Sequence, residues 1–358
     1  MNRGIVLALL AIIVICSAGL YLLKYGPSLF VESPPEERIA FISTAGGNED
    51  LWTMKWDGTD KRQVTQDAAT ERAPVWSPNG VEIAYVSNRD KNVFQIYVSA
   101  WDGTYTKQLT KATGAKDIPR WNKAGTRLAY IAAGRIFSVP RHGGTEEQVY
   151  PGVAISFGEL NPPITWVDWS SVDSVLAFMV DADRTQMLYV LEDPEREPFG
   201  VTRARRLSAS WGTKGEKLVI GFIGREGKNG IAIADIERVS SKDIWVSEDA
   251  TKGPGAVAWS PDEEKVAFEL WALEDGLPKK SLGICVLNVG AKPRLIMSGD
   301  CRNPTWSSDG KYIAFERFRE DGGRDIWRVK AEGSEAVNLT NGKGDNYQPA
   351  WSPARKKK

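Results

Sequence analysis

The single histidine, His142, is the residue to examine first for acid–base or metal chemistry. It lies in the segment PRHGG at 140–144, which is typical of a surface turn because proline and glycine favour tight reversals of the chain. One histidine and three cysteines argue against a zinc site built from cysteine and histidine ligands. The sequence also lacks Gly-x-Ser-x-Gly, the turn that carries the nucleophile of α/β-hydrolases. We therefore predict no catalytic residue, no metal site and no cofactor.

Carboxylates are numerous, and several recur at turn or equivalent positions: Asp57, Asp102, Asp262, Asp309 and Asp325. Such a set is compatible with calcium ligands or with the two carboxylates of a glycosidase. Aspartate is also common in turns, because its side chain accepts hydrogen bonds from nearby backbone N–H groups. We interpret these five as turn residues. An enzymatic alternative stays open, in which a pair such as Asp117 and Asp168 lies about 5 to 9.5 Å apart.

Binding residues are easier to nominate than catalytic ones, because aromatic and arginine side chains are the usual anchors of protein interfaces. Two long segments, 150–165 and 269–282, are predicted to be loops that expose such residues. The first candidate group is Phe157, Trp271, Arg317, Phe318 and Arg319. A second, polar group is predicted at the mouth of a central channel, where it could grip a peptide end: Arg72, Asp117, Arg120, Asp168, Arg302, Asp345 and Tyr347.

The elements that position these residues follow from an internal repeat. A tryptophan recurs at intervals of 45, 48, 42, 48, 47 and 45 residues, at Trp76, Trp121, Trp169, Trp211, Trp259, Trp306 and Trp351. A turn follows six of these tryptophans, and an apolar triplet such as Ile83-Ala84-Tyr85 comes next. We expect the small central residue of the triplet to make room for a motif tryptophan of an adjacent unit. Fixed periods of this length are typical of repeat architectures.

Each unit contains four short β-rich segments separated by turn signals. The segments are apolar on both faces, as expected for sheets covered on both sides, and radially stacked sheets meet that requirement. The first unit begins directly at 38–43, and the last stops after the tryptophan strand at 349–353. We therefore predict an all-β, seven-bladed β-propeller closed by pairing of its N- and C-terminal segments, with six blades as the alternative.

This pattern resembles the propeller of TolB-type proteins, whose WD-like repeat has the form Pro-x-Trp-Ser-Pro-Asp-Gly. PVWSPNG at 74–80 and NLTNGKGDNYQPAWSP at 338–353 carry the resemblance, which extends over nearly the whole chain after about residue 38. The resemblance implies a propeller fold. The sequence departs from TolB in its count of seven units, where TolB has six, and in having no room for TolB's separate N-terminal domain. A role in the Tol system is therefore not implied.

The N-terminal segment differs from the rest of the chain. Residues 4–23 are uncharged and apolar, long enough for a helix that spans a bilayer. We predict four parts: an anchor or signal segment (1–24), a linker (25–36), the propeller (37–353) and a basic tail (354–358). The propeller is placed outside the cytoplasm, on the periplasmic or extracellular side of a single-pass anchor, or secreted after signal cleavage. In either place Cys285 and Cys301 could form a disulfide or stay as thiols.

Equal totals of 46 basic and 46 acidic residues argue against nucleic-acid binding. We therefore expect a non-catalytic, exported or membrane-anchored scaffold that binds a protein or peptide partner in the cell envelope. The alternative is a carbohydrate-active or other hydrolase- or lyase-type enzyme that uses the channel.

Overall fold

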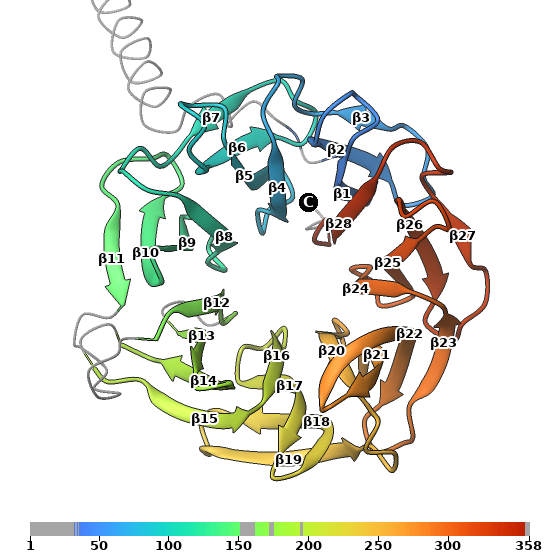
Figure 1. The fold of residues 1–358 in the computed structure, drawn as a ribbon. Coiled ribbons are helices and arrows are strands. Elements are labelled where there is room, and N and C mark those ends of the chain that lie inside the picture. The colour runs from blue at the N-terminus through green and yellow to red at the C-terminus, as the bar shows by residue number, and fades with distance from the viewer. Residues whose placement is uncertain are drawn as a thin grey trace, which may run out of the picture.

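The propeller is built from seven four-stranded sheets arranged in a ring (Figure 1). The computed structural model describes Glu32, Pro34 and residues 36–150, 162–171, 175–193 and 196–354. Within these residues all regular structure is β-strand, and no helix is long and apolar enough to cross a membrane. The hydrophobic helix predicted at 4–23 and the basic residues at 355–358 lie outside the described part of the chain.

Each blade is named here by its strands, given from the inner to the outer edge. The composite blade is β28 (Asn346–Trp351), β1 (Arg38–Ser43), β2 (Asp50–Lys55) and β3 (Arg62–Gln63). The next two blades are β4 (Glu71–Trp76), β5 (Glu82–Ser87), β6 (Gln95–Ala100) and β7 (Thr106–Gln108), then β8 (Lys116–Trp121), β9 (Arg127–Ala132), β10 (Arg135–Pro140) and β11 (Glu147–Tyr150).

Two further blades follow along the chain. They are β12 (Ile164–Trp169), β13 (Leu176–Ala182), β14 (Thr185–Leu191) and β15 (Phe199–Ala204), then β16 (Arg206–Trp211), β17 (Lys217–Arg225), β18 (Lys228–Asp235) and β19 (Ser240–Val246). The last two are β20 (Lys252–Trp259), β21 (Lys265–Glu274), β22 (Leu277–Asn288) and β23 (Arg294–Ser298), then β24 (Cys301–Trp306), β25 (Tyr312–Phe318), β26 (Arg324–Lys330) and β27 (Val337–Asn338).

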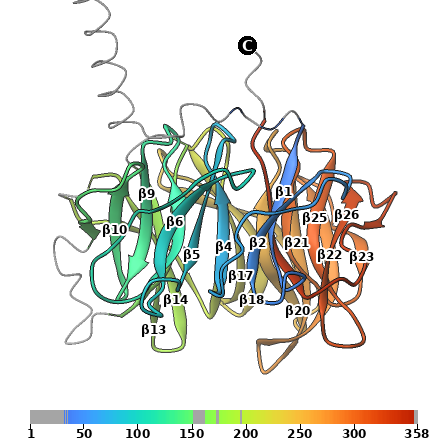
Figure 2. The same cartoon turned by 90° about the horizontal axis from the view of Figure 1, so that it is seen from above.

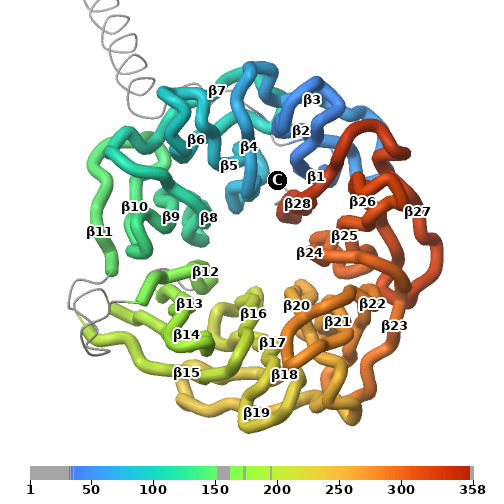
Figure 3. The backbone as a smooth tube through the Cα atoms, in the orientation of Figure 1, coloured from blue at the N-terminus to red at the C-terminus, as the bar shows by residue number. Residues whose placement is uncertain are grey.

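The composite blade joins the two ends of the described chain. β28 pairs antiparallel with β1, so that Trp351 lies opposite Ile39 and Asn346 lies opposite Ser43 (Figure 3). The Ser43 hydroxyl donates to Asn346 Oδ1 over 2.7 Å, and both side chains are buried. The pairing gives β1 a neighbour on each side and leaves β3 as the outer strand of this sheet.

The motif tryptophans lie between neighbouring blades, as predicted. Each one belongs to the same hydrophobic cluster as the central triplet residue of the preceding blade, such as Trp121 with Ala84 and Trp306 with Ala267. Four indole N–H groups also donate to a backbone carbonyl of the preceding inner strand: Trp76 to Ala350, Trp121 to Val75, Trp211 to Asp168 and Trp306 to Ala258. The small alanine therefore leaves space for the indole of the next blade.

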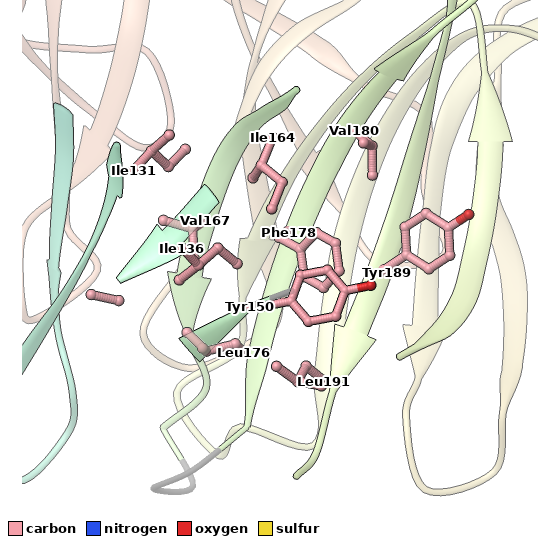
Figure 4. Close-up of a cluster of buried hydrophobic side chains, with 11 residues drawn as sticks. Ile131, Ile136, Tyr150, Ile164, Val167, Leu176, Phe178, Val180, Tyr189 and Leu191 are labelled. Carbon is pink, nitrogen blue, oxygen red and sulfur yellow. The ribbon is translucent and has the colours of Figure 1, made fainter. Parts of the chain in front are cut away.

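One cluster shows how large residues fill the same interface. Figure 4 shows Tyr150 of β11 beside Phe178 of β13. Their ring centroids are 4.8 Å apart. Ile136 and Val167 lie next to them, so this core is shared between the β8–β11 and β12–β15 blades. Because each sheet is covered by apolar side chains on both faces, its strands are apolar at successive positions.

A β-bulge interrupts several inner strands at the residue before the motif proline. Ala73, Ile118, Asn303 and Gln348 have φ values of 53°, 52°, 53° and 53°, and each lies where the register with the second strand shifts. Such a bulge turns the local backbone away from the regular ladder. The N–H groups of Ala73, Asn303 and Gln348 then donate to a neighbouring blade, whereas that of Ile118 donates to Asp117 of its own strand.

The segment 269–282 is not a loop, and that prediction is wrong. It belongs to a long hairpin of β21 and β22, in which Trp271 lies opposite Ser281. Asp275 and Gly276, with φ of 52° and 68°, form its two-residue turn. Asp-Gly is a strong signal for this kind of hairpin, because both central residues need positive φ. The two cysteines outside the N-terminal segment, Cys285 and Cys301, are both buried free thiols.

The tryptophan hydrogen bond can be tested with two matched substitutions. Trp306 donates to the Ala258 carbonyl over 3.0 Å, whereas the equally buried Trp259 Nε1 has no partner among the described residues. We expect Trp306→Phe to lower the free energy of unfolding by about 1 kcal/mol more than Trp259→Phe, because both lose volume but only the first leaves a carbonyl without its donor. Denaturant unfolding measures the difference. Equal losses would show that the hydrogen bond contributes nothing.

Candidate functional site

Four of the predicted binding residues come together in an alternating stack of arginine and aromatic side chains. We call it the arginine–aromatic ladder: Trp271, Arg302, Phe318, Arg324 and Tyr347, from β21, β24, β25, β26 and β28. The Arg302 guanidinium carbon lies 5.1 Å from the Trp271 ring centroid and 4.3 Å from that of Phe318. The Arg324 guanidinium carbon lies 5.8 Å from the Phe318 centroid and 3.7 Å from that of Tyr347.

Carboxylates hold the two arginines of the ladder in place. Arg302 forms a bidentate ion pair with Asp300, at 2.9 and 3.1 Å. Arg324 donates to Asp345 through Nε (2.9 Å) and Nη2 (2.5 Å). Burial raises the pKa of Asp345, but the Arg324 hydrogen bonds outweigh it and hold that pKa below its ordinary value. These ion pairs therefore hold both guanidinium groups in place between the aromatic rings.

The ladder lies on one face of the propeller. This connection face carries the turns between second and third strands, such as 319–323, and the connections into the inner strands, such as 339–345. The opposite face, the terminal face, is where β1 begins and β28 ends (Figure 2). The ladder side chains are partly exposed, apart from Tyr347, which is buried with its hydroxyl donating to Glu49 Oε1.

Beneath the ladder, a hydrogen-bond network links successive blades through the bulges. Glu269 Oε1 accepts from the Asn303 N–H (2.7 Å) and its Oε2 accepts from Trp271 Nε1 (2.8 Å). Glu316 Oε1 accepts from Asn303 Nδ2 and from the Gln348 N–H, both at 2.7 Å. Gln348 Oε1 then accepts from the Ala73 N–H at 2.7 Å, which carries the network into the β4–β7 blade. The network stabilises the platform on which the ladder rests.

Glu316 is the most buried carboxylate of this network, with 2% of its surface exposed. Burial raises the pKa of Glu316, while the hydrogen bonds from Gln348 and Asn303 and the charge of Arg324 lower it in part. Arg324 Nη1 lies 3.9 Å from Glu316 Oε2, so one arginine contacts both the ladder and the network. The residues Arg324, Glu269 and Glu316 were not predicted. The recurrence of Glu directly after the Val-Ala-Phe and Ile-Ala-Phe triplets was the available signal.

The remaining residues that were predicted at a channel mouth form two separate ion pairs. Arg72 Nη2 lies 3.1 Å from Asp117 Oδ2, near the start of β4 and β8. Arg120 Nε lies 3.7 Å from Asp168 Oδ1, near the opposite end of β8 and β12. Burial raises the pKa of Asp168, and the charge of Arg120 lowers it in part. Each carboxylate of the candidate enzymatic pair is therefore engaged by an arginine of the preceding blade.

The other predicted site residues are dispersed. Arg317 points away from Phe318, because successive strand residues face opposite sides, and its guanidinium carbon lies 4.8 Å from the Trp327 ring centroid. Arg319 donates to Asp321 and Asp325, both at 3.1 Å, and thereby fixes the turn beside the ladder. Phe157 lies outside the described residues.

The polar residues considered for catalysis have structural surroundings. His142 lies in the turn between β10 and β11, and burial and the neighbouring Arg141 and Lys107 lower its pKa. Asp102 accepts from the Thr104 N–H and hydroxyl, as expected of a turn residue. Asp325 is different: it is buried at the start of β26 and accepts from the Thr340 hydroxyl at 2.8 Å. No group of three or more His, Cys, Asp or Glu residues in the described ranges could hold a metal ion.

This chain is similar in sequence and in fold to TolB proteins. Residues 27–151 match the family model of the TolB β-propeller domain. Tol-Pal system protein TolB from Desulfosudis oleivorans is 37% identical over 54 residues, which are 15% of this chain and 12% of that protein. The crystal structure of TolB from Acinetobacter baumannii has a TM-score of 0.56 and 16% identity, and the match covers 95% of this chain and 71% of that one. The chain is therefore similar to the TolB β-propeller domain over residues 27–151, and its fold is similar to that of TolB.

The fold of this chain is also similar to that of proteins other than TolB. An oligogalacturonate lyase in complex with manganese has a TM-score of 0.61 at 10% identity, and the match covers 86% of each chain. At this identity the match concerns the fold alone. Because the match to the Desulfosudis protein spans 12% of that relative, its function is not transferred by similarity to this chain.

The buried Glu316 predicts a pH-dependent difference in stability. Because its pKa is raised above 4.5, the folded state holds this proton more tightly than the unfolded state. The contribution of Glu316 to the free energy of unfolding therefore falls as pH rises from 4.5 through the pKa of Glu316 in the folded state. We expect the stability of Glu316→Gln, relative to wild type, to increase over that range, because glutamine stays neutral.

Urea unfolding of both proteins between about pH 4.5 and 8 measures this difference. The exposed Glu264→Gln is the matched control, and its difference from wild type should be the smaller. A Glu316→Gln difference that does not change with pH would contradict the prediction.

Proposed function

We propose that this chain is a non-catalytic, extracytoplasmic propeller scaffold that binds a protein or peptide partner through the arginine–aromatic ladder. The observation that carries the proposal is the stack of three aromatic rings and two carboxylate-held arginines on the connection face. Tryptophan, tyrosine and arginine dominate the binding energy of protein interfaces when they are held in place and partly buried. The similarity to the TolB β-propeller domain supports a role in the cell envelope, since the relative from Desulfosudis oleivorans is a Tol-Pal system protein.

The position of the linker supports an orientation. The Glu32 carbonyl accepts from Trp101 Nε1 over 2.9 Å, and the Glu37 carboxylate accepts from the Ser308 hydroxyl. The first contact holds linker residue Glu32 at the terminal face, and the second holds the start of the propeller there, next to β1 (Figure 2). If residues 4–23 anchor the chain in a membrane, as we propose, the ladder faces away from that membrane. A partner on the far side can then reach it without steric conflict with the bilayer.

Site-specific photo-crosslinking tests the partner. A photoreactive amino acid at Phe318 should yield adducts with an extracytoplasmic protein in the native host, whereas the same amino acid at Lys123, in the turn between β8 and β9 on the terminal face, should not. The combination Trp271→Ala with Arg302→Ala should lower the Phe318 adduct at least about tenfold, because it removes one end of the ladder. Mass spectrometry identifies the adduct. Equal adducts from Phe318 and Lys123 would refute binding through the ladder.

Membrane attachment is tested separately by fractionation. If residues 4–23 are an uncleaved anchor, the full-length chain stays in the membrane pellet after alkaline carbonate extraction. Replacing Leu10 and Ile13 with lysine should move the chain out of the pellet, because a charge at the centre of a spanning helix costs about 2.5 to 3.5 kcal/mol. A shortened, soluble chain in the extracytoplasmic fraction would show cleavage of a signal segment and refute the anchor.

A further inference from the structure

A basic groove lies on the connection face between the β12–β15 and β16–β19 blades. The groove has a volume of about 1060 Å³. One side is lined by the β13–β14 turn and β15, and the other side by the β17–β18 turn and β19. Small-molecule pockets usually enclose about 300 to 1,000 Å³, so the groove has room for a peptide segment. A neighbouring cavity of about 540 Å³ shares Arg184, Thr185 and Arg205 with it and extends to Leu277 at the tip of the β21–β22 hairpin.

The groove concentrates positive charge in a chain whose formal net charge is zero. Its lining has five cations, Arg184, Arg203, Arg205, Arg225 and Lys242, against two carboxylates, Glu226 and Asp243. Arg225 pairs with Asp243, which leaves Glu226 as the other carboxylate. Arg203 donates to the Thr185 hydroxyl over 3.2 Å and Arg205 donates to the Asp275 carbonyl, so neither charge is neutralised by these contacts.

None of Arg184, Arg203, Arg205 and Lys242 forms an ion pair with another described residue. The groove therefore carries an excess of unpaired cations around a concave surface. Charges that line a concave, low-dielectric wall focus the field and attract ligands of opposite sign. The occupant that fits this surface carries several negative charges.

The backbone of the groove favours an extended occupant. β15 is the terminal strand of its sheet, in the order β12-β13-β14-β15, and its residues 201–204 line the groove. In a terminal strand, alternate N–H and C=O groups point away from the sheet and can pair with an added strand. β15 has six residues and β19, which also lines the groove, has seven, whereas the outer strands β3 and β27 have two each, so the groove is flanked by two of the longer outer strands.

We propose that the basic groove binds an extended acidic peptide segment of a protein partner, which adds a strand to the free edge of β15. Carboxylates of the segment pair with Arg184, Arg203 and Lys242, and its backbone pairs with β15. The cations select against basic and neutral strands, which would otherwise pair with an exposed edge. This groove is separate from the arginine–aromatic ladder, so the proposal does not depend on the ladder being an interface.

The test measures binding of a defined peptide to the full-length chain in non-ionic detergent. A fluorescein-labelled peptide of about eight residues that alternates glutamate and valine is titrated with protein, at about 50 mM salt and again at about 0.5 M, by fluorescence anisotropy. We expect saturable binding that weakens at high salt, at least tenfold weaker binding to Arg184→Ala with Lys242→Ala, and no measurable binding of the glutamine–valine peptide.

Two controls test whether binding requires the cations of the groove and whether it requires the backbone N–H groups of the peptide. Lys123→Ala with Lys214→Ala removes two exposed cations from turns on the terminal face and should leave binding unchanged. An acidic peptide N-methylated at alternate residues keeps its charge but loses half of its backbone donors, and should bind at least tenfold more weakly if a strand is added. Circular dichroism and thermal melting confirm that each variant is folded.

Three results would overturn the proposal. The first is equal binding by wild type and the Arg184→Ala, Lys242→Ala variant. The second is equal binding of the N-methylated and unmethylated peptides, which would exclude strand addition. The third is groove-dependent binding to phosphatidylglycerol vesicles in the absence of peptide binding, which would identify the occupant as an anionic lipid surface.

Discussion

The packing of each motif tryptophan against the small central residue of the preceding blade's triplet is the contact on which the whole ring depends. It recurs at every blade interface, with Val219 in place of alanine at one of them. A tryptophan buries roughly 150 to 250 Å². Without space on the facing sheet, that bulk would push the blades apart. The indole N–H adds direction where it reaches a carbonyl of the neighbouring inner strand.

The bulge before the motif proline provides a second kind of contact between neighbouring blades. It frees a backbone N–H that a regular ladder would use within the blade, and Glu269, Glu316 and Gln348 accept these donors from the next blade. These three side chains thereby connect the inner strands of successive blades. The same three blades present the arginine–aromatic ladder, so the ladder and this hydrogen-bond network share their supporting strands.

The repeat was predictable because a fixed spacing of tryptophans, turns and apolar triplets is visible in the chain itself. The bulges were not, because a residue before proline ordinarily avoids the helical regions and prefers extended backbone. Trp271, Arg302, Phe318 and Tyr347 could be nominated by residue type, but Arg324 could not, since its role depends on Asp345 and Tyr347 from another strand. Arg317 was misplaced because sequence adjacency ignores the alternation of strand side chains.

The composite blade has a consequence for the order of events during synthesis. Ser43 finds its partner Asn346 only across 303 residues of sequence, so β1 keeps an unpaired edge until the last strand has left the ribosome. Contacts of such long range form late, because the entropy of closing the loop must be overcome first. The other six sheets are each built from four consecutive strands, so closure of the ring through β28 is the one blade assembly that must wait for the end of the described chain.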